Sequence, residues 1–223
     1  MQSSIRHLGL IPDGNRRFAR GKSKPPWWGH EAGVRNMREF FHWVFEGWKI
    51  PVLTVYGLSS KNLSRAPVEV SRIFSLIKLG LKDAEKKDFF MMNNVRLRFI
   101  GRLHLLPKNF QSALRSAERA TEANKKFFLN IAFAYDGQAE IVDAVAKGAR
   151  TEEEISQKIY LGGFPPPDLI IRTSGEQRLS GFLLWGSSYS EFAFCRKKWP
   201  EFVRKDLDSI LRNYEARNRR FGR

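Results

Sequence analysis

Short apolar runs rich in β-branched residues alternate along this chain with longer segments whose apolar residues recur at helical period. This alternation predicts a single α/β domain in which a central, mainly parallel β-sheet is flanked by helices. The expected strands are residues 7–11, 52–57, 95–100, 128–135, 168–173, 182–185 and 191–194. The expected helices are residues 31–48, 68–92, 108–124, 138–147, 152–161 and 201–219. No repeat, low-complexity tract or linker divides the 223 residues, a length that suits one domain with a sizeable core.

Local signals mark the starts of several of these helices. Pro67 and Pro107 stand at or just before an expected first turn, where a backbone N–H has no intrahelical partner in any case. Thr151, with Glu154 three residues later, is the pattern of a capping box.

The chain carries 39 Lys and Arg against 23 Asp and Glu, a formal net charge of +16. Such a balance predicts anionic partners, namely nucleic acid, an acidic membrane surface or phosphorylated small molecules. A merely solvated basic surface is the alternative reading for most of these side chains. The single cysteine, Cys195, excludes an internal disulfide and a cysteine-cluster metal site. No apolar run approaches the roughly 18 to 20 residues that span a bilayer, and the N-terminus does not resemble a signal peptide, so we expect a cytoplasmic protein.

Polar loops follow four of the expected strands. In an open parallel sheet, ligands bind outside the carboxyl ends of the strands, so we expect these loops to meet at one edge of the sheet. The four loops contain residues 13–17, 59–65, 136–138 and 172–180. Four anion-binding loops at one edge indicate a site more strongly than any one of them.

The first of these loops places a carboxylate, Asp13, directly before Gly14 and Asn15, which tolerate positive φ, and before Arg16 and Arg17. Aspartate is a ligand for Mg²⁺, and guanidinium groups with backbone N–H groups bind phosphate oxygens. A metal-bound phosphate ester therefore fits here. The alternative is an ordinary surface turn, because Asp-Gly is a common turn pair.

The loop at residues 172–180 offers two guanidinium groups, from Arg172 and Arg178, and the hydroxyl of Ser180, a set that suits a diphosphate. The glycine and lysine spacing of a Walker loop is absent, as is a dinucleotide-binding glycine pattern. Glu191 lies further on, where it is either a helper metal ligand or the partner of an arginine; both readings stay open.

The four histidines lack the spacing of a zinc site, and the serines lack a nucleophile elbow. His30 stands at an expected helix start, where it suits contact with an anion or an acid role. The helix expected over residues 68–92 carries an apolar face that ends in Phe89–Met92. Such a face is either ordinary core packing or the wall of a channel for a hydrocarbon. Phosphate-binding loops beside a hydrocarbon wall suggest a prenyl diphosphate.

These motifs, in this order and over nearly the whole chain, resemble those of the cis-prenyltransferases, the undecaprenyl diphosphate synthase family. The matching segments are Asp13-Gly14-Asn15-x-Arg17, Gly29-His30-x-x-Gly33, Ser59-Ser60-x-Asn62-x-x-Arg65, Arg172 to Ser180, Phe182-Leu183-Leu184-Trp185, Trp199-Pro200 and Arg219-Arg220-Phe221-Gly222. The chain resembles a short and divergent member of the family.

The resemblance implies a central parallel sheet, a homodimer, a hydrophobic tunnel lined by two helices, and Mg²⁺-assisted condensation of an allylic diphosphate with isopentenyl diphosphate. It implies that Asp13 binds Mg²⁺ and assists ionisation, with Glu191 helping to set the metal. The allylic diphosphate would be cradled by Gly14, Asn15, Arg16 and Arg17, with His30 beside it. The second diphosphate would be held by Arg172, Arg178 and Ser180. Asn62 and Arg65 would contact the reacting ends, and Asn15 and Ser59 match positions implicated in deprotonation.

Several positions depart from the family pattern. The departures from the usual residues are Arg16 (glycine), Phe18 (tryptophan), Pro26 (arginine), Leu58 (phenylalanine), Lys61 (acidic), Leu63 (aromatic) and Gln138 (arginine). These changes suggest re-routed diphosphate contacts and short or irregular prenyl products.

Two other functions remain open at this stage. A non-catalytic subunit of a heteromeric cis-prenyltransferase is one, although such subunits typically lose the aspartate that this chain keeps as Asp13. A basic nucleic-acid-binding protein rests on charge alone, and we expect no nucleic-acid partner. Peripheral contact with a membrane, through a lipid product, is a further expectation.

Overall fold

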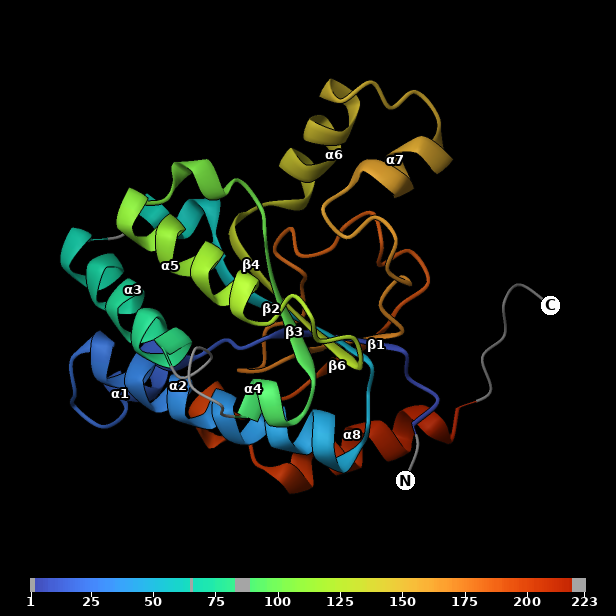
Figure 1. The fold of residues 1–223 in the computed structure, drawn as a ribbon. Coiled ribbons are helices and arrows are strands. Elements are labelled where there is room, and N and C mark those ends of the chain that lie inside the picture. The colour runs from blue at the N-terminus through green and yellow to red at the C-terminus, as the bar shows by residue number, and fades with distance from the viewer. Residues whose placement is uncertain (1–2, 65, 83–88, 218–223) are drawn as a thin grey trace.

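The structure, a computed structural model, describes residues 3–64, 66–82 and 89–217. Its centre is a six-stranded sheet in the order β3-β4-β2-β1-β5-β6, and every neighbouring pair is parallel, which confirms the predicted fold class (Figure 1). The strands are β1 (His7–Ile11), β2 (Val52–Ser59), β3 (Val95–Ile100), β4 (Phe127–Tyr135), β5 (Leu169–Arg172) and β6 (Glu191–Phe194). Because all six run in one direction, their carboxyl ends share one edge of the sheet.

Helices cover both faces of this sheet, as parallel strands require (Figure 1). They are α1 (Asn15–Arg20), α2 (Pro26–Phe41), α3 (Pro67–Lys82), α4 (Phe89–Met92), α5 (Lys108–Ala120), α6 (Gly137–Ala146), α7 (Glu152–Lys158) and α8 (Arg204–Glu215). A π-helix (His42–Gly47) continues α2, and 3₁₀ turns lie at Ser60–Ser64, Leu103–Leu105 and Trp199–Glu201. None of the helices in the described part of the chain is long and apolar enough to cross a membrane.

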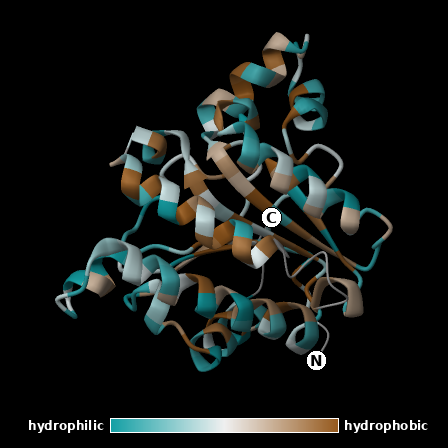
Figure 2. Ribbon diagram, turned by 60° about the vertical axis from the view of Figure 1, so that its left-hand side comes forward, coloured by the Kyte–Doolittle hydropathy of each residue, from teal (hydrophilic) through white to brown (hydrophobic). Residues whose placement is uncertain are grey.

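The core forms two clusters. The larger is built on leucine, valine, isoleucine and phenylalanine side chains of the strands, with side chains from α2, α3, α5 and α8. The smaller includes Tyr56, Tyr135 and Phe182. Figure 2 shows hydrophobic residues concentrated on the central strands, while the helices alternate between hydrophobic and hydrophilic residues. Alternation of this kind on a helix is the mark of one buried stripe.

Capping side chains define the helices that were expected at residues 138–147 and 152–161. The Asp136 Oδ1 accepts hydrogen bonds from the backbone N–H groups of Gln138 (2.9 Å) and Ala139 (3.4 Å) at the start of α6. The Thr151 Oγ1 accepts one from the Glu154 N–H at 3.2 Å. The Glu154 carboxylate, however, accepts from the Arg150 N–H rather than from that of Thr151. Thr151 is therefore confirmed as the capping residue, but the return bond of the capping box comes from the N–H group of Arg150, one residue before Thr151.

Three expected elements were wrong or misplaced. Residues 182–185 form turns, with Leu183 at φ 47° shortly after Gly181 at φ 84°. The helix expected from residue 31 begins at Pro26, and the helix expected at 201–219 spans only Arg204–Glu215. The sequence reading also missed α1, which follows Gly14 directly.

The long helix expected over residues 68–92 is described only in part. α3 ends at Lys82 and α4 occupies Phe89–Met92, while residues 83–88 lie outside the described residues.

Candidate active site

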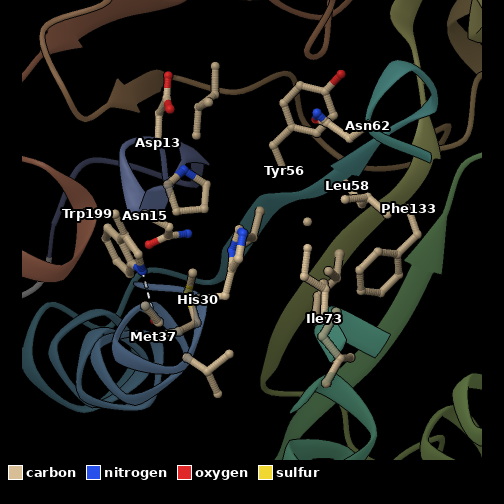
Figure 3. Close-up of a pocket in the computed structure, with 18 of the residues that line it drawn as sticks. Asp13, Asn15, His30, Met37, Tyr56, Leu58, Asn62, Ile73, Phe133 and Trp199 are labelled. Atoms are coloured by element: carbon tan, nitrogen blue, oxygen red, sulfur yellow. Dashed lines mark hydrogen bonds between the residues drawn. The ribbon is translucent and has the colours of Figure 1, made fainter. Parts of the chain in front are cut away.

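The four loops predicted to meet do line one cavity, of about 1280 Å³, at the carboxyl edge of the sheet. Its polar end carries residues from all four loops, including Asp13, Ser59, Asp136 and Arg172. Figure 3 shows Asp13, Asn15 and Tyr56 at one end of the cavity, and Met37, Ile73 and Phe133 further in. The volume exceeds the roughly 300–1,000 Å³ of common small-molecule sites, so a ligand longer than a typical metabolite fits.

Asp13 lies just past the end of β1 with its carboxylate between two arginines. Its Oδ2 accepts a hydrogen bond from the Arg172 guanidinium at 2.9 Å and is 3.3 Å from the Arg17 guanidinium. Burial opposes ionisation, yet the hydrogen bond and charge of Arg172, together with Arg17, hold the pKa of Asp13 below its usual value. Asp13 is therefore ionised at neutral pH.

Arg172 closes β5 and is itself 5 % exposed. Besides its bond to Asp13, its guanidinium donates to the Ser180 Oγ at 2.8 Å and to the Arg178 carbonyl. These bonds hold Arg172 and Ser180 in one array, as the resemblance implies for a diphosphate site.

Arg178 and Arg17 both bind the carboxylate of Glu176, a residue for which the sequence indicated no separate role. The Glu176 carboxylate accepts from the Arg17 guanidinium at 2.6 Å and from that of Arg178 at 2.5 Å. Arg178 is largely exposed and does not line the cavity. Glu176 thus links the first loop to the fifth-strand loop, a pairing that sequence spacing cannot reveal.

His30 lies in the second turn of α2 rather than at a helix start, because α2 begins four residues earlier at Pro26. Its Nε2 is 3.1 Å from the Glu69 Oε1 at the start of α3, and the Arg16 Nε is 3.5 Å from the same oxygen. Glu69 therefore joins α1, α2 and α3 around the cavity. The position expected to carry arginine, Pro26, is the helix start itself.

Asn15 is held where α1 crosses α2, against two glycines of α2. A Cβ at Gly29 would lie 2.0 Å from the Asn15 backbone oxygen, and one at Gly33 would lie 2.4 Å from the Asn15 Oδ1. That Oδ1 is buried and has no hydrogen-bond partner among the described residues. A buried acceptor without a partner is costly, so this side chain is held by packing against Gly33 at the point where Asn15 lines the cavity.

Gly33→Ala is expected to lower turnover by at least tenfold with little change in melting temperature. The new methyl group meets the end of the Asn15 side chain, which rotates away, while alanine favours the helix by about 1 kcal/mol. Steady-state kinetics and thermal unfolding measure the two effects. Gly80→Ala on α3 is the matched control, since a Cβ there meets no described atom within 4 Å; equal turnover in both variants would contradict the role given to Gly33.

The second-strand loop brings Ser59, Lys61 and Asn62 to the cavity. The Ser59 hydroxyl donates to the Asn62 Oδ1 at 2.9 Å and accepts from the Asn62 N–H at 3.2 Å, which closes the 3₁₀ turn. Both residues are thus positioned together, as expected. Arg65 lies outside the described residues.

Asp136, from the predicted fourth-strand loop, and Tyr56, which the sequence did not indicate, form a second polar corner of the cavity. Burial, with the nearby Asp136 carboxylate, raises the pKa of Tyr56 to about 12, so the phenol stays protonated and donates. The Tyr56 hydroxyl is 3.3 Å from the carbonyls of Tyr135 and Ser180. Gln138, where the family usually has arginine, lines the same corner.

Glu191 does not join Asp13 within this chain. It begins β6 and pairs in register with Leu169 at the start of β5, at the edge of the sheet opposite to Asp13. Its carboxylate accepts from the Arg217 guanidinium at 2.8 Å. Of the two open readings, the structure of one chain supports the arginine partner; a metal held by both carboxylates of one chain is excluded by the strand register.

The residues present fit a magnesium–diphosphate complex better than a bare ion. No group of three or more acidic, histidine or cysteine side chains that could hold a metal occurs in residues 3–64, 66–82 and 89–217. Asp13 offers an ionised carboxylate beside arginines suited to a diphosphate. Mg²⁺ commonly binds through one or two carboxylates plus substrate phosphates and water, so this donor set is sufficient when diphosphate is present.

The inner end of the cavity is apolar and closed by aromatic rings. Phe89 and Phe90 of α4 line it and pack on Phe41, with ring centroids 6.5 and 5.8 Å away. His42 meets the Phe89 ring edge-on at 4.3 Å. Of the two readings of this stretch, the channel wall is supported for Phe89 and Phe90.

Known proteins resemble this chain over almost its full length. Residues 11–222 match the family described as putative undecaprenyl diphosphate synthase. An isoprenyl transferase of Thermus thermophilus is 46% identical over 98% of this chain and 89% of its own. A tritrans,polycis-undecaprenyl-diphosphate synthase (geranylgeranyl-diphosphate specific) of Methanopyrus kandleri is 43% identical over 97% of this chain and 84% of its own.

Solved structures agree with the sequence comparison. Lavandulyl diphosphate synthase from Lavandula x intermedia, in complex with dimethylallyl diphosphate, superimposes with a TM-score of 0.92 at 31% identity and covers 99% of both chains. A probable undecaprenyl diphosphate synthase from Campylobacter jejuni gives a TM-score of 0.82 at 29% identity over the whole of both chains. With the family match and these relatives, the chain belongs to the cis-prenyltransferases, the undecaprenyl diphosphate synthase family.

Proposed function

We propose that this chain is a Mg²⁺-dependent prenyltransferase, which condenses an allylic prenyl diphosphate with isopentenyl diphosphate or with a second allylic diphosphate and gives short or irregular products. The observation that carries the proposal is the ionised Asp13 between Arg17 and Arg172, at the mouth of a cavity that becomes apolar inward. The names of the relatives, which are prenyl transferases and prenyl diphosphate synthases, support the same reaction class.

In this reaction the bond from C1 of the allylic substrate to its diphosphate breaks, and the diphosphate leaves with the electron pair. A carbon–carbon bond forms to the second substrate, and a proton is released. Arg17 and Arg172 bind and stabilise the departing anion, while the apolar inner cavity keeps water from the allylic cation. Mg²⁺, when bound with diphosphate at Asp13, supplies further charge stabilisation.

Asn15 and Ser59 hold polar atoms at the same end of the cavity and are the groups we propose near the proton that is lost. Arg16, His30 and Asn62 frame the substrate, and Arg178 acts through Glu176 and Arg17 rather than from the cavity wall. Arg65 keeps its proposed role in the second-strand loop.

The test is turnover by the purified protein with Mg²⁺, labelled isopentenyl diphosphate and a panel of allylic diphosphates, followed by sizing of the products. Dimethylallyl diphosphate is also supplied alone, because an irregular coupling needs no isopentenyl diphosphate. Products from the lone protein support the proposal. Activity only after a second chain is added would favour the non-catalytic subunit. Absence of products both from the lone protein and with a second chain would contradict the proposal.

We also propose that the chain forms a homodimer through the β6 edge of the sheet. Phe192 and Phe194 stack on each other there, with ring centroids 6.3 Å apart, and are each 38% exposed, so two neighbouring aromatic rings face solvent on an edge strand. Sedimentation equilibrium is expected to give twice the 25.9 kDa mass of the chain. A Phe194→Ser variant should shift the equilibrium toward the monomer; a monomeric wild-type protein would contradict the proposal.

A further inference from the structure

A second cavity, of about 360 Å³, lies between the edge strand β3 and helix α5. Four arginines and two glutamates line it: Arg96, Arg98, Arg115, Arg119, Glu118 and Glu122. We call it the arginine cleft. Nothing in the proposed reaction uses these side chains.

The cleft exists because α5 lies along the outer edge of β3. The Phe99 N–H donates to the Glu118 Oε1 at 2.8 Å, and the Leu97 N–H donates to the Thr121 Oγ1 at 3.0 Å. Arg115 and Arg119 lie four residues apart on α5, on one side of the helix, and Glu122 follows in the turn after it. Arg96 and Arg98, two residues apart on β3, face the same side of the sheet.

The positive charge of the cleft is only partly neutralised by the protein, because two glutamates line it against four arginines. None of its four arginines has a carboxylate within 4 Å among the residues that the structure describes. Arg98 is fixed over the Phe164 ring at 4.9 Å. Burial, followed by the charge of Arg96, lowers the pKa of Arg98, and the nearby Glu118 carboxylate offsets this only in part. Such a cluster is stabilised by an external anion.

The cleft adjoins the closed end of the large cavity. Leu97 lines both cavities. Phe89 and Phe90 of α4 face the large cavity, whereas Met91 and Met92 of the same helix are 37% and 81% exposed. The Asn124 side-chain amide donates to the carbonyls of Phe90 (3.2 Å) and Val95 (2.9 Å), which ties α4 and the start of β3 to the end of α5. Met91 and Met92 thus lie just before the start of β3, next to the end of the cleft that Arg96 and Glu122 form.

We infer that the arginine cleft, together with Met91 and Met92, docks the chain on the surface of an anionic phospholipid bilayer, with headgroup phosphates in the cleft. Clustered basic residues bind anionic leaflets, and apolar side chains beside them enter the interface. Single-stranded RNA is less well matched, because RNA sites present aromatic side chains for stacking and no aromatic residue lines the cleft. The docking itself is argued independently of the proposed function. Only its benefit, which is to place the hydrocarbon end of the cavity at the bilayer, rests on that function.

The test is co-sedimentation of the full chain with phosphatidylcholine vesicles that contain either no phosphatidylglycerol or about 30 % of it. We expect binding to the anionic vesicles, and an Arg115→Gln/Arg119→Gln double variant should weaken it by about thirtyfold, since each basic residue near such a surface contributes about a factor of five. Both arginines are exposed on α5. Met92→Ser should weaken binding further, because it removes the exposed thioether.

A Lys205→Gln/Arg212→Gln variant is the matched control. Both residues are exposed on α8, lie outside the cleft, and their loss changes the net charge by the same amount. The control should retain most of the binding. Equal losses of vesicle binding in the two double variants would overturn the inference, because binding would then follow net charge alone. Loss of RNA binding in the cleft variant, with its vesicle binding intact, would also overturn it.

Turnover on soluble substrates without vesicles separates this inference from the proposed function. The Arg115→Gln/Arg119→Gln variant should turn over as the wild type does, since neither residue lines the large cavity. Absence of turnover in the wild type would contradict the proposed function and leave the vesicle result standing; normal turnover with unchanged vesicle binding in the variant would overturn the docking site alone.

Discussion

Replacing Asp13 by alanine is expected to reduce condensation about a thousandfold or more while the fold stays intact. The substitution removes the ionised carboxylate of the polar end, and a loss of several kcal/mol of charge stabilisation corresponds to rates of this order. The fold should persist because Arg172 keeps its hydrogen bonds to the Ser180 hydroxyl and the Arg178 carbonyl. Single-turnover kinetics and circular dichroism measure the two properties.

Asp136→Asn is the matched control for this experiment. It removes one negative charge from the same cavity, and asparagine still caps α6 through its side-chain oxygen. We expect it to keep turnover within about tenfold of the wild type, with equal or tighter binding of diphosphate because a nearby negative charge is gone. If Asp13→Ala retained near-normal turnover, the role assigned to Asp13 would be wrong.

The Asp13 variant also tests the metal assignment without reference to turnover. Because the described residues hold no group of three metal-binding side chains, we expect Mg²⁺ alone to bind weakly and to bind well only together with inorganic diphosphate. Isothermal titration calorimetry of the wild type should show this dependence, and Asp13→Ala should lose it. Tight binding of Mg²⁺ by itself would show that the site has further ligands.

The second large effect concerns the closed end of the cavity. Phe90→Ala, alone or with Phe89→Ala, is expected to lengthen the products by at least one five-carbon unit, because these rings end the apolar wall against Phe41. Removing a partly buried phenylalanine also costs stability, at most about 3–5 kcal/mol. Mass spectrometry of the products and thermal unfolding report the two outcomes.

Met92→Ala is the control for the phenylalanine variants, because Met92 lies on the same short helix and is 81% exposed. Its product lengths should equal those of the wild type. An unchanged product distribution in folded Phe89 and Phe90 variants would mean that another part of the wall sets the length.

The sequence predicted the sheet and the polar edge because both depend on local signals. β1 and β3 were predicted to the residue, since five or six consecutive apolar or alternating residues end abruptly at Asp13 and Gly101. The loops follow from the direction of the strands, so their meeting at one cavity was predictable once the sheet was parallel. The apolar segment at residues 182–185 was misread because its composition is that of a strand, whereas the chain turns there, with Leu183 at φ 47°.

Contacts that join distant segments were not predictable in the same way. The link from Glu69 to His30 and Arg16, and that from Glu176 to Arg17, join residues 39 to 159 positions apart. The resemblance implied that Glu191 and Asp13 hold one metal. The strand register instead places Glu191 at the amino end of β6, whereas Asp13 follows the carboxyl end of β1. Register is set by the packing of whole strands, so a single carboxylate gives no sign of it.

The two edges of the sheet have different consequences for self-association. Along β3, Glu118 and Thr121 of α5 occupy N–H groups that another strand would otherwise bind. Beyond β6 the described residues add no further strand, and its phenylalanines stay exposed. A molecule with one sealed and one open edge can join a second copy only by like edges, which yields a closed two-fold pair instead of a growing fibril. The same helix that forms the arginine cleft therefore also limits aggregation of this protein.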